Sequence, residues 1–439
     1  MANTGTTAET TAETPTAIST QRKRVIFAGL IGSVVEYYDF GIYGYTATTL
    51  AALFFPSSSA TASMLATLAV FAIAFFARPV GSVLFGHIGD RYGRKPALAT
   101  TVLLMALATF AIGLLPSHAS IGIVAPILLV VARLLQGLSA GGEVSGAASF
   151  LAEAAPENRR GFMTSATQVG SVSGLLLASA TIGLINVILT PQQFAEFGWR
   201  IAFLLGLPTG LVGLYVRYRL EDSPAFRKIE KRGEIVSLPT VELFRTNFIP
   251  MVKGVGLTAA NFAGYYLVFI YISIYLQTAG TLTRAQATWS TTATLIVAAL
   301  TLSLFGLLSD VIGRKWVIGG SSLGFLLLTL PMFKILQGTD LTMIIAAQMV
   351  LSICEAAVLG AIWGALTELF PTRVRYSGVG IAFNIAGALV GGSAPFIATW
   401  LIQQTGDKSS PAYFMMAIAA ITLLTLLTVP ETANRKMPE

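Results

Sequence analysis

The sequence predicts an all-α membrane protein in which twelve transmembrane helices form two pseudo-symmetric bundles of six. Only 11% of its 439 residues are charged, whereas a soluble globular protein carries about 25%. Apolar stretches of about 20 residues, enough to cross the hydrocarbon core of a bilayer, recur along the whole chain. One charged motif also occurs twice, once in each half. The unbroken apolar stretches exclude an outer-membrane barrel, whose short strands alternate polar and apolar residues.

The chain divides into two halves at residues 220–247, the longest connection between predicted spans, which is polar and basic. We therefore expect an N-terminal bundle over residues 21–219 and a C-terminal bundle over residues 248–430. Residues 1–20, rich in Thr and Ala, are expected to form a disordered cytoplasmic tail, and residues 431–439 a second tail. A signal peptide is the alternative for the first apolar stretch, but that stretch is too long and carries two acids. The predicted spans are 25–53, 63–87, 97–115, 124–151, 162–187, 199–219, 248–278, 286–309, 316–336, 341–369, 376–403 and 411–429.

The distribution of Lys and Arg predicts that both termini lie in the cytoplasm. In a protein of the inner (plasma) membrane, the loops that face the cytoplasm collect these residues. With cytoplasmic termini, basic clusters such as residues 21–24, 91–95 and 227–232 all lie inside. The outer loops and their flanks then hold only Arg200, Arg284, Lys334 and Lys408.

The repeated motif, G-x-x-x-D-x-x-G-R-K, joins the second predicted span to the third in each half. The positive-inside rule accounts for Lys and Arg in cytoplasmic loops but not for the Asp of this motif. We expect Asp90 to face the N-terminus of a helix in the other half, because the helix dipole attracts an anion there. Such contacts would form a cytoplasmic gate that opens as the halves move. The alternative for the basic residues is that they are plain membrane anchors. The predicted gate residues are Asp90, Arg94, Asp310, Arg314 and Arg133.

A weaker repeat follows the fourth span of each half: EAAPENRRG begins at Glu153 and ELFPTRVRYSG at Glu368. Two copies of a six-span unit are typical of a pseudo-symmetric transporter whose site lies between its halves.

The charged motif resembles the signature of the major facilitator superfamily, and RLLQG from Arg133 resembles the fourth-helix motif of that family. VVEYYDFGIYGY, FARPVGSVLFGHIGDRYGRK, GGEVSGAASFLAE and FGWRIAF resemble its metabolite:proton symporter branch, which takes up proline and betaine, shikimate, 2-oxoglutarate and citrate. TELFPTRVRYSG and GYYLVFIYISIYL are most similar to the proline/betaine transporters. The resemblance covers about residues 25–435 and implies the major facilitator fold. Those transporters carry a long C-terminal coiled coil, so in this shorter chain we expect no osmotic activation through such a tail.

Several ionisable residues inside the spans are functional candidates, because such a group in hydrocarbon costs several kcal/mol unless it is paired or hydrated. Glu36 and Asp39 share one helix face, and two acids in a low dielectric are not both ionised easily. We predict Asp39 or Glu36 as the proton carrier, with Glu143 as the rival; the alternative is a structural ion pair with Arg78. Glu355 is a further acid in the tenth span. At ~1.5 Å per residue, Glu36, Asp39, Arg78 and Glu143 each lie ~18–24 Å above a charged residue at the cytoplasmic side of the same span. The four are therefore expected to share one layer near the middle of the bilayer.

Arg78 is the best candidate for binding a substrate carboxylate, because its planar guanidinium can hold a carboxylate with two hydrogen bonds. The alternative is a permanent pair with Asp39. The same helix arithmetic places Arg133 much nearer the outer face. We expect Arg133 to pair structurally or to take part in gating rather than to bind substrate.

Tyrosines at suitable depth predict a site for a cationic group. Aromatic rings attract quaternary ammonium groups, and Tyr43, Tyr265 and Tyr266 are the candidates in the first and seventh spans. Asn384 in the eleventh span either binds substrate or bridges helices. The alternative for each aromatic residue is that it only fills the core.

We predict a secondary active importer that carries a small carboxylate or zwitterion together with a proton. Proline or glycine betaine is the first choice of substrate, and a di- or tricarboxylate or shikimate is the alternative. A membrane sensor or channel on the same fold is the alternative of another class. No enzyme, cofactor, metal or nucleic-acid site is predicted: the two histidines lie near opposite faces, and the phosphate-binding loop of ATPases and the G-x-S-x-G motif of hydrolases are missing. The protein is expected to work as a monomer.

Overall fold

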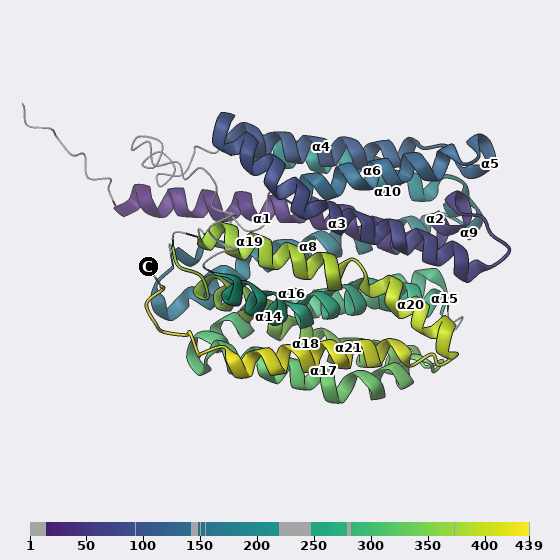
Figure 1. Cartoon of the computed structure of the whole chain (residues 1–439). Coiled ribbons are helices and arrows are strands. Elements are labelled where there is room, and N and C mark those ends of the chain that lie inside the picture. Colours follow the sequence, from purple (N-terminus) through teal and green to yellow (C-terminus); the bar gives the residue numbers. More distant parts are fainter. Residues whose placement is uncertain are drawn as a thin grey trace, which may run out of the picture.

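The computed structural model is a bundle of α-helices that run along one long axis (Figure 1). It describes residues 15–92, 94–141, 148–149, 151–153, 155–218, 247–278, 282–372 and 374–438, and these contain no strand. The first half consists of α1 (Pro15–Tyr45), α2 (Ala47–Phe54), α3 (Ala60–Tyr92), α4 (Arg94–Leu114), α5 (His118–Ile121), α6 (Val124–Ala140), η1 (Glu157–Arg159), α8 (Arg160–Ile188), α9 (Pro191–Gln193), η2 (Phe194–Gly198), α10 (Trp199–Leu204) and α11 (Gly206–Tyr218).

The second half contains α14 (Phe248–Tyr266), η3 (Leu267–Tyr271), α15 (Ile272–Thr278), α16 (Arg284–Ile312), α17 (Arg314–Leu336), α18 (Leu341–Glu368), α19 (Arg375–Ala386), η4 (Gly387–Gly391), α20 (Ala394–Thr405) and α21 (Ser410–Thr428).

In the described part of the chain, helices lie within each of the twelve predicted spans. Among the described residues, nine helical segments are long and apolar enough to cross a membrane by length and composition. Two shorter apolar helices, Ala99–Leu114 and Val124–Ala140, cover the third and fourth predicted spans, and α1 with α2 covers the first. Large apolar side chains such as Leu300, Leu424 and Leu427 are exposed, as expected where a protein faces lipid. The chain is therefore a multi-pass membrane protein.

One boundary differs from the prediction. The first helix begins at Pro15, so residues 15–20 are helical rather than part of a disordered tail. Proline is favoured in the first turn of a helix, where its missing N–H would have no helical partner. The rest of the predicted tail, residues 1–14, and residues 219–246 of the predicted linker lie outside the described residues.

Each half packs mainly on itself. In the first half α1 packs on α8, α3 on α6 and α4 on α11; in the second, α17 packs on α18 and α21, and α14 on α21. In Figure 1 the first half occupies the upper part of the bundle and α17, α18 and α21 the lower part. The halves meet where α8 packs on α16 and α18, where α3 packs on α19 and α20, and where α1 approaches η3 and α15.

The contact between α3 and α6 depends on glycine. A Cβ atom at Gly137 would collide with the carbonyl oxygen of Ala74, and one at Gly141 with that of Arg78. Small residues let two helix backbones approach this closely. The contact holds α3 and α6 together at the level of Arg78.

Two helices of the second half are interrupted by π-helical turns. η3 (Leu267–Tyr271) follows Tyr266 directly, and η4 (Gly387–Gly391) begins three residues after Asn384. In α3, Pro79 removes one backbone N–H from the helical ladder directly after Arg78. Such irregular turns are frequent at functional sites, and each lies beside a predicted site residue.

Candidate functional site

Arg78 of α3 pairs with Glu36 of α1. The distance from Arg78 Nη2 to Glu36 Oε1 is 2.9 Å, and both side chains are buried. The guanidinium lies 4.5 Å from the ring centroids of Phe40 and Phe75, so aromatic faces also stabilise its charge. Its Nε has no hydrogen-bond partner among the described residues. One edge of this guanidinium is therefore available to a further acceptor.

Asp39 pairs with Arg133 rather than with Arg78, which corrects one alternative drawn from the sequence. Arg133 Nη1 lies 3.5 Å from Asp39 Oδ2, and Thr109 and Gln136 each donate a hydrogen bond of 2.5 Å to Asp39 Oδ1. Gln136 Oε1 also accepts a hydrogen bond from Arg133 at 3.0 Å. Residues of three helices, α1, α4 and α6, therefore meet at the Asp39 carboxylate. Arg133 neutralises its charge, and Thr109 and Gln136 donate hydrogen bonds to it.

The predicted height of Arg133 is wrong. The arithmetic placed it much nearer the outer face than Asp39, whereas the two side chains are in contact. A rise of ~1.5 Å per residue gives relative height only along one continuous helix, and Arg133 and Asp39 lie on different helices, α6 and α1. Arg133 stays a predicted gate residue, but its observed neighbours are Asp39 and the ring of Tyr43, 4.2 Å from the guanidinium carbon.

Aromatic rings from both halves meet beside Arg78. Tyr37 of α1 contacts Tyr265 of α14, with ring centroids 5.3 Å apart, and Phe75 of α3 contacts Tyr266 at 5.0 Å. The ring of Phe262 stacks parallel to that of Tyr266. The ring of Phe383 contacts both Phe262 and Trp363, and the ring centroids are 4.5 Å apart in each of these two pairs. This chain of rings, Tyr37, Phe75, Phe262, Tyr265, Tyr266, Trp363 and Phe383, is called here the aromatic interface.

Several polar atoms of the aromatic interface are buried without a hydrogen-bond partner among the described residues. They are the hydroxyls of Tyr265 and Tyr266, Nε1 of Trp363 and, next to Phe262, Oδ1 of Asn261. A buried polar atom without a partner costs about 1–3 kcal/mol, so native proteins rarely leave several together unless a ligand or water satisfies them. This is the strongest indication of a ligand site in the described part of the chain.

Two predicted substrate-binding residues already have polar partners. The Tyr43 hydroxyl donates to the carbonyl oxygen of Thr67 at 3.0 Å. Nδ2 of Asn384 donates to Ser82 Oγ at 3.1 Å and to the carbonyl oxygen of Gly141 at 3.4 Å. Asn384 therefore bridges the two halves, which is the alternative that the sequence left open, and its substrate role stays a prediction.

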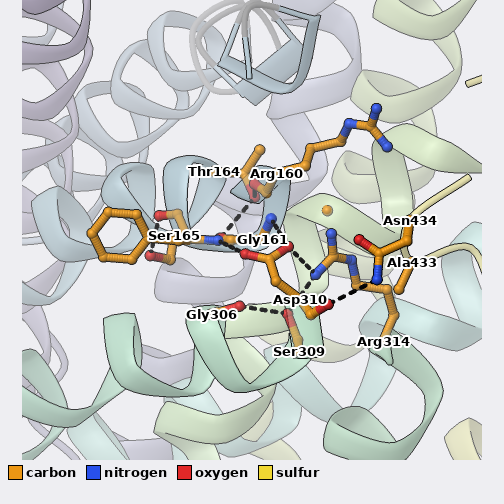
Figure 2. A network of polar contacts seen from close by, with 12 residues as sticks. Arg160, Gly161, Thr164, Ser165, Gly306, Ser309, Asp310, Arg314, Ala433 and Asn434 are labelled. Atoms are coloured by element: carbon orange, nitrogen blue, oxygen red, sulfur yellow. Dashed lines mark hydrogen bonds and ion pairs between the residues drawn. The ribbon is translucent and has the colours of Figure 1, made fainter. Parts of the chain in front are cut away.

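Asp310 lies at the N-terminus of a helix from the other half (Figure 2). Its carboxylate accepts hydrogen bonds from the backbone N–H groups of Gly161 at 2.8 Å and Phe162 at 2.9 Å, in the first turn of α8. The guanidinium of Arg314 pairs with the same carboxylate at 2.8 Å. A side chain at position 161 would collide with Ser309 and Arg314. This is the contact predicted from the sequence for its repeat partner Asp90.

The weaker repeat forms two ion pairs across the interface. Arg160, at the start of α8, pairs with Glu368, at the end of α18, at 2.8 Å. Arg375, at the start of α19, pairs with Glu153 of the first half, also at 2.8 Å. The acid of each copy thus binds the arginine of the other. The end of the bundle where α8, α17 and α19 begin and α16 and α18 end is called here the charged end.

The segment after α21 crosses the charged end. Glu431 accepts hydrogen bonds from the backbone N–H groups of Arg314 at 2.9 Å and Lys315 at 3.1 Å, which caps α17. Arg160 of the first half donates to the carbonyl oxygen of Arg435 at 3.3 Å, so this segment joins both halves. Within the same segment, Thr432 donates a hydrogen bond to Glu368 and Asn434 donates one to the carbonyl oxygen of Asp310. The carbonyl oxygen of Pro438 accepts hydrogen bonds from Arg375 and Thr372.

Three predicted site residues fall outside this description. Glu143 lies outside the described residues, and so do the side chains of Asp90 and Arg94. Sequence reasoning named Glu153 and Glu368 only as parts of a repeat. The spacing from Glu153 to Arg160 equals the spacing from Glu368 to Arg375. This equal spacing was the available signal that the acid of one copy pairs with the arginine of the other. Nothing in the sequence pattern marked Thr109, an ordinary polar residue in an apolar helix. Gln136 belongs to the RLLQG motif, but no role was predicted for it. Among the described residues, no three His, Cys, Asp or Glu side chains are placed to hold a metal ion.

Two family models match the chain: Sugar (and other) transporter over residues 25–237 and Major Facilitator Superfamily over residues 254–438. The chain is 37% identical over 424 residues to the proline/betaine transporter of Salmonella typhimurium, covering 94% of this chain and 85% of that protein. It is 38% identical to the glycine betaine/proline/ectoine/pipecolic acid transporter OusA of Dickeya dadantii, covering 94% and 84%.

Among solved structures, the proton:xylose symporter XylE bound to 6-bromo-6-deoxy-D-glucose superimposes with a TM-score of 0.75 at 19% identity, covering 95% of this chain and 98% of that one. This likeness concerns the fold, two bundles of six transmembrane helices. The identity to the transporters of Salmonella and Dickeya extends over nearly the whole chain. The chain therefore belongs to the major facilitator superfamily and, within it, to the family of the proline/betaine transporters.

Proposed function

We propose that this protein imports a small zwitterion, proline or glycine betaine, together with a proton. The observation that carries the proposal is the set of unpartnered polar atoms of the aromatic interface beside Arg78. A zwitterion needs one cation for its carboxylate and a polarisable surface for its ammonium group. Arg78 offers the first, and the rings of Tyr265 and Tyr266 offer the second. The names of the relatives fit the same substrate class.

The Glu36–Arg78 pair suggests how a proton is coupled to substrate. When Glu36 is ionised it occupies Arg78, and a substrate carboxylate must compete with it. A proton on Glu36 removes its charge and leaves the guanidinium for the substrate. Proton and substrate would therefore bind together, as symport requires. Asp39 is less suited to this role, because Arg133, Thr109 and Gln136 already stabilise its charged form.

We place the charged end on the cytoplasmic side of the inner membrane, with both termini inside. The support is the positive-inside rule: Arg160, Arg314, Lys315 and Arg375 gather at this end. The ion pairs there and the contact of Asp310 with α8 would hold the cytoplasmic side closed. At the other end, Tyr45 of α1 donates to the carbonyl oxygen of Phe269 in η3 at 2.8 Å. Breaking one set of contacts while the other holds gives alternating access by a monomer.

The test is uptake of radiolabelled proline and glycine betaine into liposomes that contain the purified protein. We expect saturable accumulation driven by an inwardly directed proton gradient, abolished by a protonophore. Competition by citrate, 2-oxoglutarate and shikimate separates the zwitterion from the organic-acid alternative. Uptake that does not saturate and ignores the protonophore would instead favour a channel.

A further inference from the structure

Glu355 is a buried acid that the mechanism above does not use. It lies in the middle of α18 (Leu341–Glu368), ~20 Å from either end of the helix. Its side chain is 0% exposed. Neither carboxyl oxygen has a hydrogen-bond partner among the described residues, and none of the ion pairs found there includes it.

In the described part of the chain, the helices around Glu355 present no opposite charge to it. A Cβ atom at Gly264 of α14 would collide with Oε2 of Glu355 and would lie 2.9 Å from Phe325 of α17, so these three residues meet. Two titratable groups lie close enough to Glu355 to interact with it electrostatically: Tyr265 on α14, and Cys354, which precedes Glu355 in α18. The other charged side chains described on the helices that pack on α18 lie near helix ends: Arg160, Lys253, Arg284, Asp310, Arg314, Lys315, Lys334 and Arg375.

These surroundings determine the protonation state of Glu355. An ionised carboxylate without a partner in low dielectric is far more costly than a neutral one, and such a group takes up a proton instead. Packing alone does not account for an acid here, because an apolar side chain of similar length would fill the space without this cost. Gly264, which leaves room for the carboxyl, is followed directly by Tyr265 of the aromatic interface. Glu355 thus lies next to that interface in the second half, whereas Glu36 lies on α1 of the first half.

We propose that Glu355 is a second proton-binding site, protonated in the closed protein and deprotonated when the C-terminal half opens and water reaches it. The inference rests on the proton coupling put forward above. It adds a proton site to the half that lacks the Glu36 and Asp39 pairs. Substrate that favours the closed state would draw a proton onto Glu355 as well as onto Glu36.

The experiment measures proton uptake when proline or glycine betaine is added to purified protein in weakly buffered detergent solution containing a pH indicator. We expect Glu355→Gln, which mimics the neutral acid, to bind substrate and exchange it while taking up fewer protons per substrate than wild type. Glu355→Asp should restore part of the uptake. Ser352→Ala is the matched control, because Ser352 is a buried, non-titrating residue on the same helix that donates to the carbonyl oxygen of Thr294. It should take up protons as wild type does.

The outcomes separate this inference from the proposed function. Wild-type protein that binds substrate without proton uptake would refute proton coupling as a whole. Proton uptake that is equal in wild type and Glu355→Gln would refute the role of Glu355 alone. If Glu355→Gln does not fold, infrared spectra of the wild type and Glu355→Asp decide the matter. A wild-type spectrum at neutral pH without the carbonyl band of a protonated carboxyl group would overturn the proposal.

Discussion

Arg160 of the first half and Glu368 of the second form an ion pair of 2.8 Å in which both side chains are buried. Arg314 of the second half lies 3.4 Å from the same carboxylate. The related pair of Arg375 and Glu153 has the same length, but the Glu153 side chain is 44% exposed. The two pairs occupy equivalent places in the repeat and differ in burial, and burial determines how much each pair contributes to holding the two halves together.

Glu368→Gln should open the charged end. It leaves Arg160 buried without its acid, whereas Arg314 keeps its pair with Asp310. Removing one partner of a buried ion pair costs about 3–5 kcal/mol. Accessibility can be measured with a cysteine in place of buried Ser165 of α8, in a Cys354→Ser background, by the rate of reaction with a water-soluble maleimide. We expect much faster labelling in Glu368→Gln.

Glu153→Gln is the matched control for this change. Because Glu153 is partly exposed, its pair should contribute no more than about 1 kcal/mol. Labelling at position 165 should rise only slightly. Equal labelling rates in the two variants would contradict the difference in burial as the cause.

Glu36→Gln should separate exchange from accumulation. The variant frees Arg78 permanently, so labelled substrate should still exchange with unlabelled substrate across a liposome membrane. Proton-driven accumulation should fall well below that of the wild type, because no proton is needed to release Arg78 and only the proton proposed for Glu355 stays coupled to substrate. Glu36→Gln and Asp39→Asn each remove the anion beside a buried arginine, so both should lower the stability of the protein by about 3–5 kcal/mol. Only Glu36→Gln should separate exchange from accumulation. If Asp39→Asn is stable and shows exchange without accumulation, while Glu36→Gln accumulates substrate to the wild-type level, the carrier is Asp39.

Arg78→Lys should weaken substrate binding while the charge is kept. A lysine offers a single ammonium group in place of the planar fork, and a hydrogen bond to a charged group contributes roughly 1.5–3 kcal/mol. We expect KM for transport to rise by about tenfold or more. A KM like that of the wild type would show that the substrate carboxylate binds elsewhere.

Tyr266→Phe and Tyr45→Phe form a matched pair of hydroxyl deletions. The Tyr266 hydroxyl has no partner among the described residues, so its removal should leave the melting temperature nearly unchanged and raise the substrate Kd. The Tyr45 hydroxyl donates to Phe269, so its removal should cost about 1 kcal/mol of stability. Thermal melting with and without proline measures both effects. A substrate Kd that is unaffected by Tyr266→Phe would argue against this hydroxyl as a ligand group.

Gly137→Ala should strongly destabilise the first half. The added methyl group would collide with the carbonyl oxygen of Ala74 in α3, and overpacking a close contact costs about 1–3 kcal/mol or more. Gly320→Ala in α17 is the control, because nothing lies within 4 Å of its added Cβ atom. It should be neutral or slightly stabilising. Similar melting temperatures for the two variants in detergent would contradict the close helix contact.

The sequence by itself determined the twelve spans and the existence of two related halves. Hydrophobicity over about 20 residues is a local property that lipid imposes on a helix, so it can be recognised without knowing how helices pack. The repeated motif also predicted, through the helix dipole, an acid facing a helix N-terminus across the interface. The structure shows that contact for Asp310 with the first turn of α8.

Only the tertiary structure decided which charges meet. From the sequence, Arg78 had two possible acids, and Arg133 was expected far from both. In the structure Arg78 pairs with Glu36 and Arg133 with Asp39. The physical reason is that residue spacing fixes height and facing only within one continuous helix. The rotation, tilt and offset between helices come from side-chain packing, such as the glycine contact of α3 with α6. For the same reason, only the packing of the two halves shows that the acid of each repeat copy pairs with the arginine of the other copy, Glu368 with Arg160 and Glu153 with Arg375.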